Sequence, residues 1–280
     1  MKTIIVLILL VAAGAAACGG ESGESSGATQ VVAGLYPLAF AAEEVGRDRV
    51  EVTNLTPAGA EPHDLELTPR EVEEILDADL VLYLGEGFQP AVEAAVAGSD
   101  VAALDALEGL ELRDDDGVDP HVWLDPTLFA QVAERIGAEL GDETGGLVAR
   151  LNALDEEYQA GLADCDRREL VTTHDAFGYL ADRYGLEVIS ITGLSPEAEP
   201  SPQDLQSVAE LVKARGVTTV FTETLLSPEV GETVAREAGA TTATLNPLEG
   251  LTEEELERGE DYFSVMEANL ETLREGLGCR

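Results

Sequence analysis

Short apolar runs alternate along this chain with longer segments whose apolar residues recur at helical spacing. The runs Val50–Leu55, Leu80–Leu84 and Glu169–Thr173 have the length and bounding turn residues of strands. A segment with helical spacing follows each of them. Repeated strand, helix and strand order favours parallel sheets, so the pattern predicts an α/β fold.

The remaining pattern extends this order through the chain. Further strands are expected at Gln30–Ala33, Val101–Leu104, Glu187–Ile191, Thr219–Thr222 and Thr242–Leu245. Helices are expected at Pro37–Val45, from Thr68 onward, and at Pro90–Ala97, Ala176–Tyr184, Pro202–Arg215, Pro228–Ala238 and Glu260–Leu277. Thr68, Pro69 and Glu71 form a capping-box pattern. Two groups of strands predict two parallel-sheet α/β lobes.

A mostly helical stretch separates the two groups of strands. Asp125 and Pro126 have the pattern of an N-cap and a first-turn proline. The Gly145–Gly146 pair is expected to interrupt the helical pattern before a second run, Leu147–Leu162. We therefore predict an N-terminal lobe at 30–124, an interlobe helical linker at 125–163 and a C-terminal lobe at 164–280.

The N-terminus indicates an extracytoplasmic protein. Lys2, an apolar run and small residues have the layout of a signal peptide at 1–17. Cys18 follows the small residues as in a lipobox, so it is expected to become the lipidated first residue of the mature chain. Residues 18–29 are rich in Gly, Ser and Glu and are expected to form a flexible tether to the membrane.

The net charge of the chain excludes one class of binding partner. The chain has 56 acidic and 16 basic residues and a formal net charge of −40. Phosphate contacts need a basic surface, so nucleic-acid binding is excluded. The acids are spread over many helical segments, which indicates a solvated acidic coat suited to a salt-rich medium.

The three histidines, His63, His121 and His174, are the strongest chemical signal. Each lies beside an acid in a stretch of loop-forming residues, and two of them follow predicted strands. Ligands of open α/β sheets bind beyond the carboxyl ends of strands, so the three imidazoles are expected to meet in a cleft between the lobes. The loop after the last strand offers Glu249 as a fourth group. Three imidazoles and one carboxylate form a closed tetrahedral set suited to Zn²⁺.

The histidines alone leave two classes of zinc protein open. A zinc hydrolase would keep one coordination position for water and hold Glu249 off the metal as a base. A binding protein would use Glu249 as the fourth ligand and perform no chemistry. A third class, an adhesion or structural lipoprotein with incidental metal, is disfavoured by the coordinated placement of the loops.

Four motifs resemble those of zinc-family solute-binding proteins of ABC importers. They are Pro57–Asp64, Asp119–Pro126, Thr173–Leu180 and Gly193–Pro200. The resemblance covers nearly all of residues 30–280, and that family contains zinc and manganese binders. It implies two α/β lobes joined by a long helix, with the metal in the cleft held by His63, His121, His174 and Glu249. It also implies a monomer that delivers Zn²⁺ to an ABC transporter permease, with a manganese-binding member as the alternative.

Several neighbouring residues receive specific expectations. Asp64 and Asp175 are candidates to orient imidazoles, Glu223 to order a loop of the site, and Trp123 to pack beneath it. Glu199 is an alternative carboxylate ligand, because manganese-binding relatives draw one from that loop. The family's His-rich loop is replaced here by the short acidic segment 113–117. Two cysteines remain after Cys18, and outside the cytoplasm Cys165 and Cys279 are expected to pair.

Overall fold

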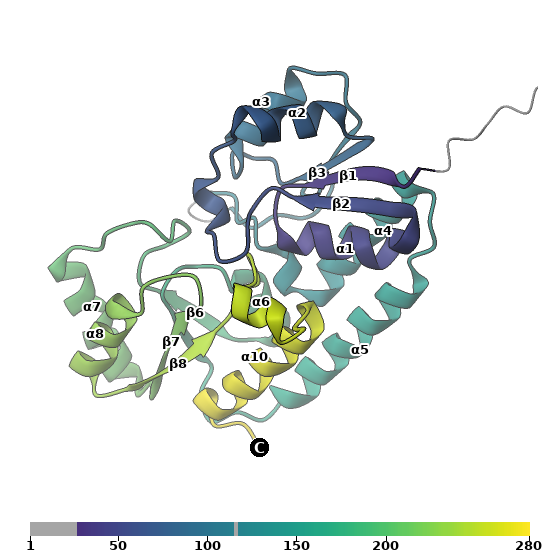
Figure 1. Ribbon diagram of the computed structural model, residues 1–280. Helices are drawn as coiled ribbons and strands as arrows, with labels where there is room; N and C mark the ends of the chain where they lie inside the picture. Colours follow the sequence, from purple (N-terminus) through teal and green to yellow (C-terminus); the bar gives the residue numbers. More distant parts are fainter. Residues whose placement is uncertain (1–26, 115–116) are drawn as a thin grey trace, which may run out of the picture.

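Two four-stranded parallel sheets, one in each lobe, form the framework of the molecule (Figure 1). The computed structural model describes residues 27–114 and 117–280. The predicted signal peptide and Cys18 lie outside these residues. The prediction of two parallel-sheet α/β lobes is confirmed, whereas the residue limits of the lobes and linker stay a prediction. Among the described residues, no helix combines the length and apolar character needed to cross a bilayer.

The N-terminal lobe has the strand order β2-β1-β3-β4. Its strands are β1 (Thr29–Ala33), β2 (Val50–Asn54), β3 (Leu80–Tyr83) and β4 (Ala103–Asp105). Its helices are α1 (Tyr36–Gly46), α2 (Pro69–Asp77) and α3 (Pro90–Ala97), with short 3₁₀ helices η1 (Arg47–Arg49), η2 (Pro62–Asp64) and η3 (Val122–Leu124). The capping box predicted at Thr68 is present, with Glu71 donating its backbone N–H to the Thr68 side chain and accepting from the Thr68 backbone N–H.

The C-terminal lobe repeats this topology with the order β6-β5-β7-β8. Its strands are β5 (Glu169–Thr172), β6 (Glu187–Ser190), β7 (Thr219–Glu223) and β8 (Thr241–Leu245). Its helices are α6 (Gly178–Tyr184), α7 (Pro202–Arg215), α8 (Glu229–Ala238), α9 (Glu253–Glu257) and α10 (Tyr262–Leu277). The sequence pattern did not predict α9. In each lobe the strand order reverses beside the first strand, which is where α/β sheets bind ligands.

Two helices join the lobes, α4 (Pro126–Leu140) and α5 (Gly145–Gly161). The expected break at Gly145–Gly146 was wrong, because these glycines are the first two residues of α5. The interruption lies earlier, at Gly141, which caps α4 in the left-handed conformation (φ 69°) that glycine adopts without strain. In Figure 1, α5 runs down one side of the molecule from the first lobe to the second, with α10 beside it.

The two lobes share one hydrophobic core. Its buried residues come from both sheets and from the helices between them, for example Leu82, Phe129, Leu151, Phe221 and Leu273. Separate smaller cores lie on the outer faces, one around Val81 and Ile75 in the first lobe and one around Val220 and Val212 in the second. Apolar burial is the main favourable term in folding, so the shared core holds the lobes in a fixed relation.

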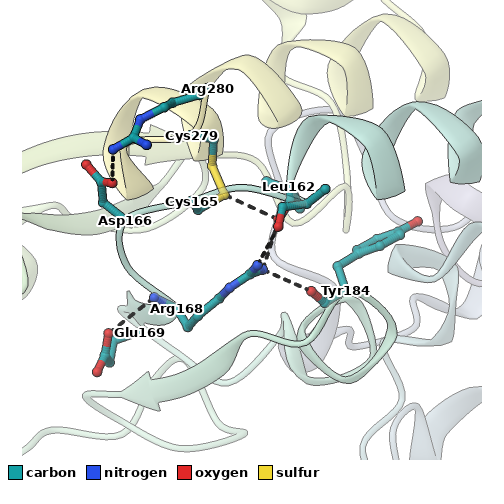
Figure 2. Close-up of a disulfide and its surroundings, with 9 residues drawn as sticks. Leu162, Cys165, Asp166, Arg168, Glu169, Tyr184, Cys279 and Arg280 are labelled. Carbon is teal, nitrogen blue, oxygen red and sulfur yellow. Dashed lines mark hydrogen bonds and ion pairs between the residues drawn. A yellow bond between two sulfur atoms is a disulfide. The ribbon is translucent and has the colours of Figure 1, made fainter.

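A disulfide between Cys165 and Cys279 closes the C-terminal lobe (Figure 2). Cys165 lies in the chain that leaves α5, and Cys279 follows α10. Backbone hydrogen bonds run alongside the bond, from Asp166 N to Gly278 O at 3.3 Å and from Arg167 N to Leu277 O at 3.1 Å. The C-terminal helix is therefore attached to the start of the second lobe, as expected for these two cysteines.

Candidate metal centre

His63, His121, His174 and Glu249 meet at the boundary of the two lobes. One potential ligand atom from each lies within 4.8 Å of those of the others. His63 belongs to η2, beyond the carboxyl end of β2, and His121 lies in the segment that follows β4. His174 and Glu249 follow β5 and β8. Each lobe thus supplies two groups from the carboxyl ends of its strands, which is the arrangement expected from the sequence.

The three imidazoles converge on a single carboxylate oxygen. Oε1 of Glu249 lies 2.9 Å from Nε2 of His63, 2.9 Å from Nε2 of His121 and 3.3 Å from Nε2 of His174. The side chains of His121 and His174 are 0% exposed and that of Glu249 is 1% exposed. Only His63, at 16%, reaches solvent.

Two further carboxylates hold the buried rings from behind. Nδ1 of His121 lies 2.8 Å from Oδ1 of Asp119, which also accepts the backbone N–H of His121 at 3.0 Å. Nδ1 of His174 bonds Oε2 of Glu223, and the other oxygen of Glu223 accepts the His174 backbone N–H at 2.9 Å. An ionised carboxylate only accepts, so Nδ1 of each ring carries the hydrogen and Nε2 points into the site.

Strand register brings Glu223 to its histidine. Strands β5 and β7 pair in parallel with Thr172 opposite Phe221, so the residues two positions later, His174 and Glu223, leave the sheet side by side. The expectation that Glu223 orders this loop agrees with the contacts. Trp123 also packs beneath the site as expected, with its ring centroid 5.2 Å from that of His121.

Other expectations for neighbouring acids were wrong. Asp64 is exposed, and the backbone N–H of Asp175 bonds Gly193 while its Oδ1 has no hydrogen-bond partner in the described part of the chain. Glu199 is exposed and lies outside the four-residue group. Asp119, which sequence reasoning did not single out, orients His121 instead. Its position two residues before the histidine, across Pro120, was the available signal.

His63 is held more loosely than the other two rings. Its backbone N–H donates to Oε1 of Glu61 at 3.1 Å, and its ring meets that of Phe88 edge-on with centroids 4.6 Å apart. A cavity of about 180 Å³ opens beside it, lined by residues of both lobes that include Phe88, Pro120 and Leu194. His63 is therefore the ligand position nearest to solvent.

The charges of the site depend on these contacts. Burial and the charge of Glu249 raise the pKa of Glu61 to about 8. Burial favours the neutral ring of His121, but hydrogen bonds to Asp119 and Glu249 outweigh it and raise its pKa to about 9. The pKa of His174 is raised through Glu223 and Glu249, again against burial, whereas burial lowers the pKa of His63. Burial opposes ionisation of Glu249, but the three histidines hold its pKa well below the usual range.

The four groups can hold a divalent cation in place of the protons that the imidazoles share with Glu249. The site has three nitrogen donors and one carboxylate, the number and type that tetrahedral zinc takes. Oε2 of Glu249 is buried and has no hydrogen-bond partner in the described ranges, which leaves lone pairs available to a cation. The nitrogen-rich set suits Zn²⁺ better than the oxygen-preferring Mg²⁺, Ca²⁺ or Mn²⁺.

Comparison with known families identifies the chain. Residues 31–276 match the family model of ZnuA, the periplasmic component A of the zinc-uptake complex. The chain belongs to the ZnuA family. This ZnuA-family protein is 32% identical to the high-affinity zinc uptake system protein ZnuA of Bacillus subtilis, over 93% of the chain and 92% of that relative.

Longer relatives contain the same unit. The chain is 35% identical to the zinc-binding protein AdcA of Streptococcus pyogenes over 89% of its own length, but the match spans only 56% of AdcA. The crystal structure of the Zn(II)-bound ZnuA-like domain of Streptococcus pneumoniae AdcA superposes with a TM-score of 0.80 at 35% identity, covering 90% of this chain and 99% of that domain. This ZnuA-family protein thus shares its fold with that AdcA domain.

Proposed function

We propose that this protein captures Zn²⁺ outside the cytoplasm and delivers it to the permease of an ABC importer. The proposed ligands are His63, His121, His174 and Glu249, and zinc is the cargo of the site. The convergence of three Nε2 atoms on one oxygen of Glu249 carries the proposal, because it brings four protein donors within 4.8 Å of one another. The family and the zinc-binding relatives support it.

Substitution of the ligands tests this assignment. His121→Ala removes a buried donor from a site without a spare imidazole, so zinc affinity should fall by at least about 100-fold. His63→Ala should also weaken binding. The measurement is isothermal titration with a competing chelator, on protein stripped of metal. Wild-type stoichiometry and affinity in both variants would refute the ligand set.

A manganese-binding member of the family is the second candidate. Neutral imidazoles favour zinc over manganese, and Glu249 is the only carboxylate in the four-residue group. In competition, Zn²⁺ should displace Mn²⁺ from the purified protein. Retention of Mn²⁺ against equimolar Zn²⁺ would favour the manganese role.

A zinc hydrolase is disfavoured by the position of Glu249. A base would stand off the metal beside a bound water, whereas this carboxylate lies within hydrogen-bonding distance of two imidazoles. We infer that the protein performs no chemistry on its cargo.

Membrane attachment is proposed through Cys18. A lipid on this residue and the tether to residue 29 would keep a monomeric protein near its permease. Cys18→Ser should release the protein from the membrane fraction of expressing cells. A Ser variant that stays with the membrane would contradict the anchor.

A further inference from the structure

A set of buried polar side chains holds the loop that carries Glu249. The loop leaves β8 at Asn246 and ends at Thr252, the N-cap of α9. The side chains of Asn246, Glu255 and Asn269 are polar, yet each of these residues is no more than 7% exposed. Buried polar groups are costly unless they are hydrogen-bonded, so each of these side chains needs partners within the protein.

Asn246 lies at the centre of this set. Its Oδ1 accepts the backbone N–H of Leu248 at 2.7 Å, and its Nδ2 donates to Oε1 of Glu255 at 2.9 Å. Its backbone N–H donates to Oδ1 of Asn269 at 2.9 Å, and its carbonyl accepts from Nδ2 of Asn269 at 2.7 Å. Both polar atoms of the Asn246 side chain are thus occupied by the protein.

These bonds maintain an unfavourable backbone conformation next to Glu249. Leu248 has φ 58°, in the left-handed region that residues with a Cβ seldom adopt, and its side chain is fully buried. The neighbouring carbonyl of Pro247 accepts Nε1–H of Trp123 at 2.8 Å. The loop is therefore fixed immediately before and at Leu248, and this conformation sets the direction in which the next residue enters the metal centre.

We propose that Asn246 is a positioning residue that, with Glu255 and Asn269, forms a clamp presenting the Glu249 carboxylate to the three histidines. The proposal rests on the zinc-binding role proposed above and adds a requirement for an amide at position 246. An aspartate there would place a carboxylate oxygen against Oε1 of Glu255 with no hydrogen between them. The two buried like charges would repel and shift the loop.

A reciprocal pair of substitutions tests the clamp. In Asn246→Asp two acceptors face each other. Oε2 of Glu255 accepts the backbone N–H of Thr252 at 2.7 Å while Oε1 accepts from Asn246, so the single acceptor oxygen of the amide in Glu255→Gln cannot serve both donors. The double variant N246D/E255Q restores one donor facing one acceptor. Zinc affinity should fall about 10–100-fold in N246D, as for other residues that orient metal ligands, and should recover in the double variant.

A double-mutant cycle with Glu249→Ala separates positioning from general damage. If Asn246 acts through Glu249, N246D should cause no further loss of zinc affinity in the E249A background. Tyr158→Phe is the control, because it removes a buried hydrogen bond to the Met266 carbonyl of α10 and should leave zinc affinity unchanged. If N246D shows no cooperative melt, Asn246→Ala, which removes both side-chain bonds without adding charge, replaces it in the cycle.

The possible results distinguish the two proposals. Wild-type zinc affinity in N246D, no recovery in N246D/E255Q, or a full additional loss in the E249A background would each overturn the clamp. Wild-type affinity in E249A itself would instead overturn the role of Glu249 as a ligand.

Discussion

Each buried imidazole of the metal centre uses its two ring nitrogens for different tasks. In His121 and His174, Nδ1 bonds a carboxylate behind the ring, and Nε2 faces Glu249. The carboxylate fixes the ring orientation and keeps a hydrogen on Nδ1. When a metal displaces the proton that Nε2 shares with Glu249, the Nε2 lone pair becomes available to that metal. At the scale of single residues, the site depends on the acids behind the ligands as well as on the ligands.

Asp119 is not one of the proposed metal ligands, yet its removal should weaken zinc binding. Asp119→Ala leaves Nδ1 of His121 without its acceptor, so zinc affinity should fall about 10–100-fold. Asp64→Ala is the matched control, since this exposed acid adjoins His63 in sequence only. The measurement is titration with a competing chelator. Equal effects of the two substitutions would show that Asp119 has no specific part in orienting His121.

At the scale of elements, polar contacts fix α5 against two helices of the C-terminal lobe. The hydroxyl of Tyr158 donates to the Met266 carbonyl of α10, and Asp155 accepts from Arg183 of α6 at 2.7 and 2.8 Å and from the Tyr184 hydroxyl at 3.1 Å. The charged pair lies at the point where α5 meets α6 of the second lobe. Its geometry specifies how the helix is oriented against α6.

This pair should make stability depend on acid pH. Hydrogen bonds and the charge of Arg183 hold the pKa of Asp155 below its usual range. Its contribution to stability is therefore present above the unfolded-state pKa of about 3.9 and is lost as pH falls through the lower folded-state pKa. Asp155→Asn should lower the free energy of unfolding at pH 7 by about 1.5–3 kcal/mol.

Denaturant unfolding between pH 2.5 and 7 measures this effect. The difference between wild type and Asp155→Asn should shrink below about pH 4, because the carboxylate takes up its proton first in the unfolded state and only at lower pH in the folded state. Glu157→Gln, at an exposed position on the same helix, should follow the wild-type profile. A constant difference across the whole range would contradict the assigned charge contribution.

The disulfide should stabilise the folded second lobe by lowering the conformational entropy of the unfolded chain. It joins residues 114 apart in sequence, for which the chain-entropy model gives about 4–5 kcal/mol. The double variant C165S/C279S should lose stability by up to this amount in denaturant unfolding and keep its zinc stoichiometry. Two freely alkylatable thiols in the unreduced wild-type protein would show that the bond does not form in solution.

At the scale of the whole molecule, the surface charge and the shared core have opposite effects on the stability of the folded state. A net charge of −40 on 280 residues repels itself in the folded state, while apolar residues of both lobes and the joining helices pack into one core. Because the two lobes share their main hydrophobic core, that core resists large movements between them. The acidic coat makes the stability of that core depend on the medium.

Added salt should therefore stabilise the metal-free protein. The Debye length falls from about 10 Å at 0.1 M to about 3 Å at 1 M, so the melting temperature should rise most steeply over this range of potassium chloride. Zinc affinity should fall only modestly, because the ligand atoms are buried. A series of thermal melts with and without zinc measures both effects. A melting temperature that is flat or falls with salt would contradict the role assigned to the coat.

The sequence by itself predicted the order of the strands and of every α-helix except α9, the three histidines and Glu249 as a group, and the resemblance to the family. These features are local: strand and helix periods, a scarce residue type and short motifs are visible without distant contacts. Tertiary structure alone decided which acids hold the rings, because His174 meets Glu223 through the register of β5 and β7, while its sequence neighbour Asp175 bonds elsewhere. It also decided the break at Gly141 and the clamp around Asn246, whose partners lie 9 and 23 residues away. Contacts between distant residues depend on how the elements pack, and no single stretch of chain contains that information.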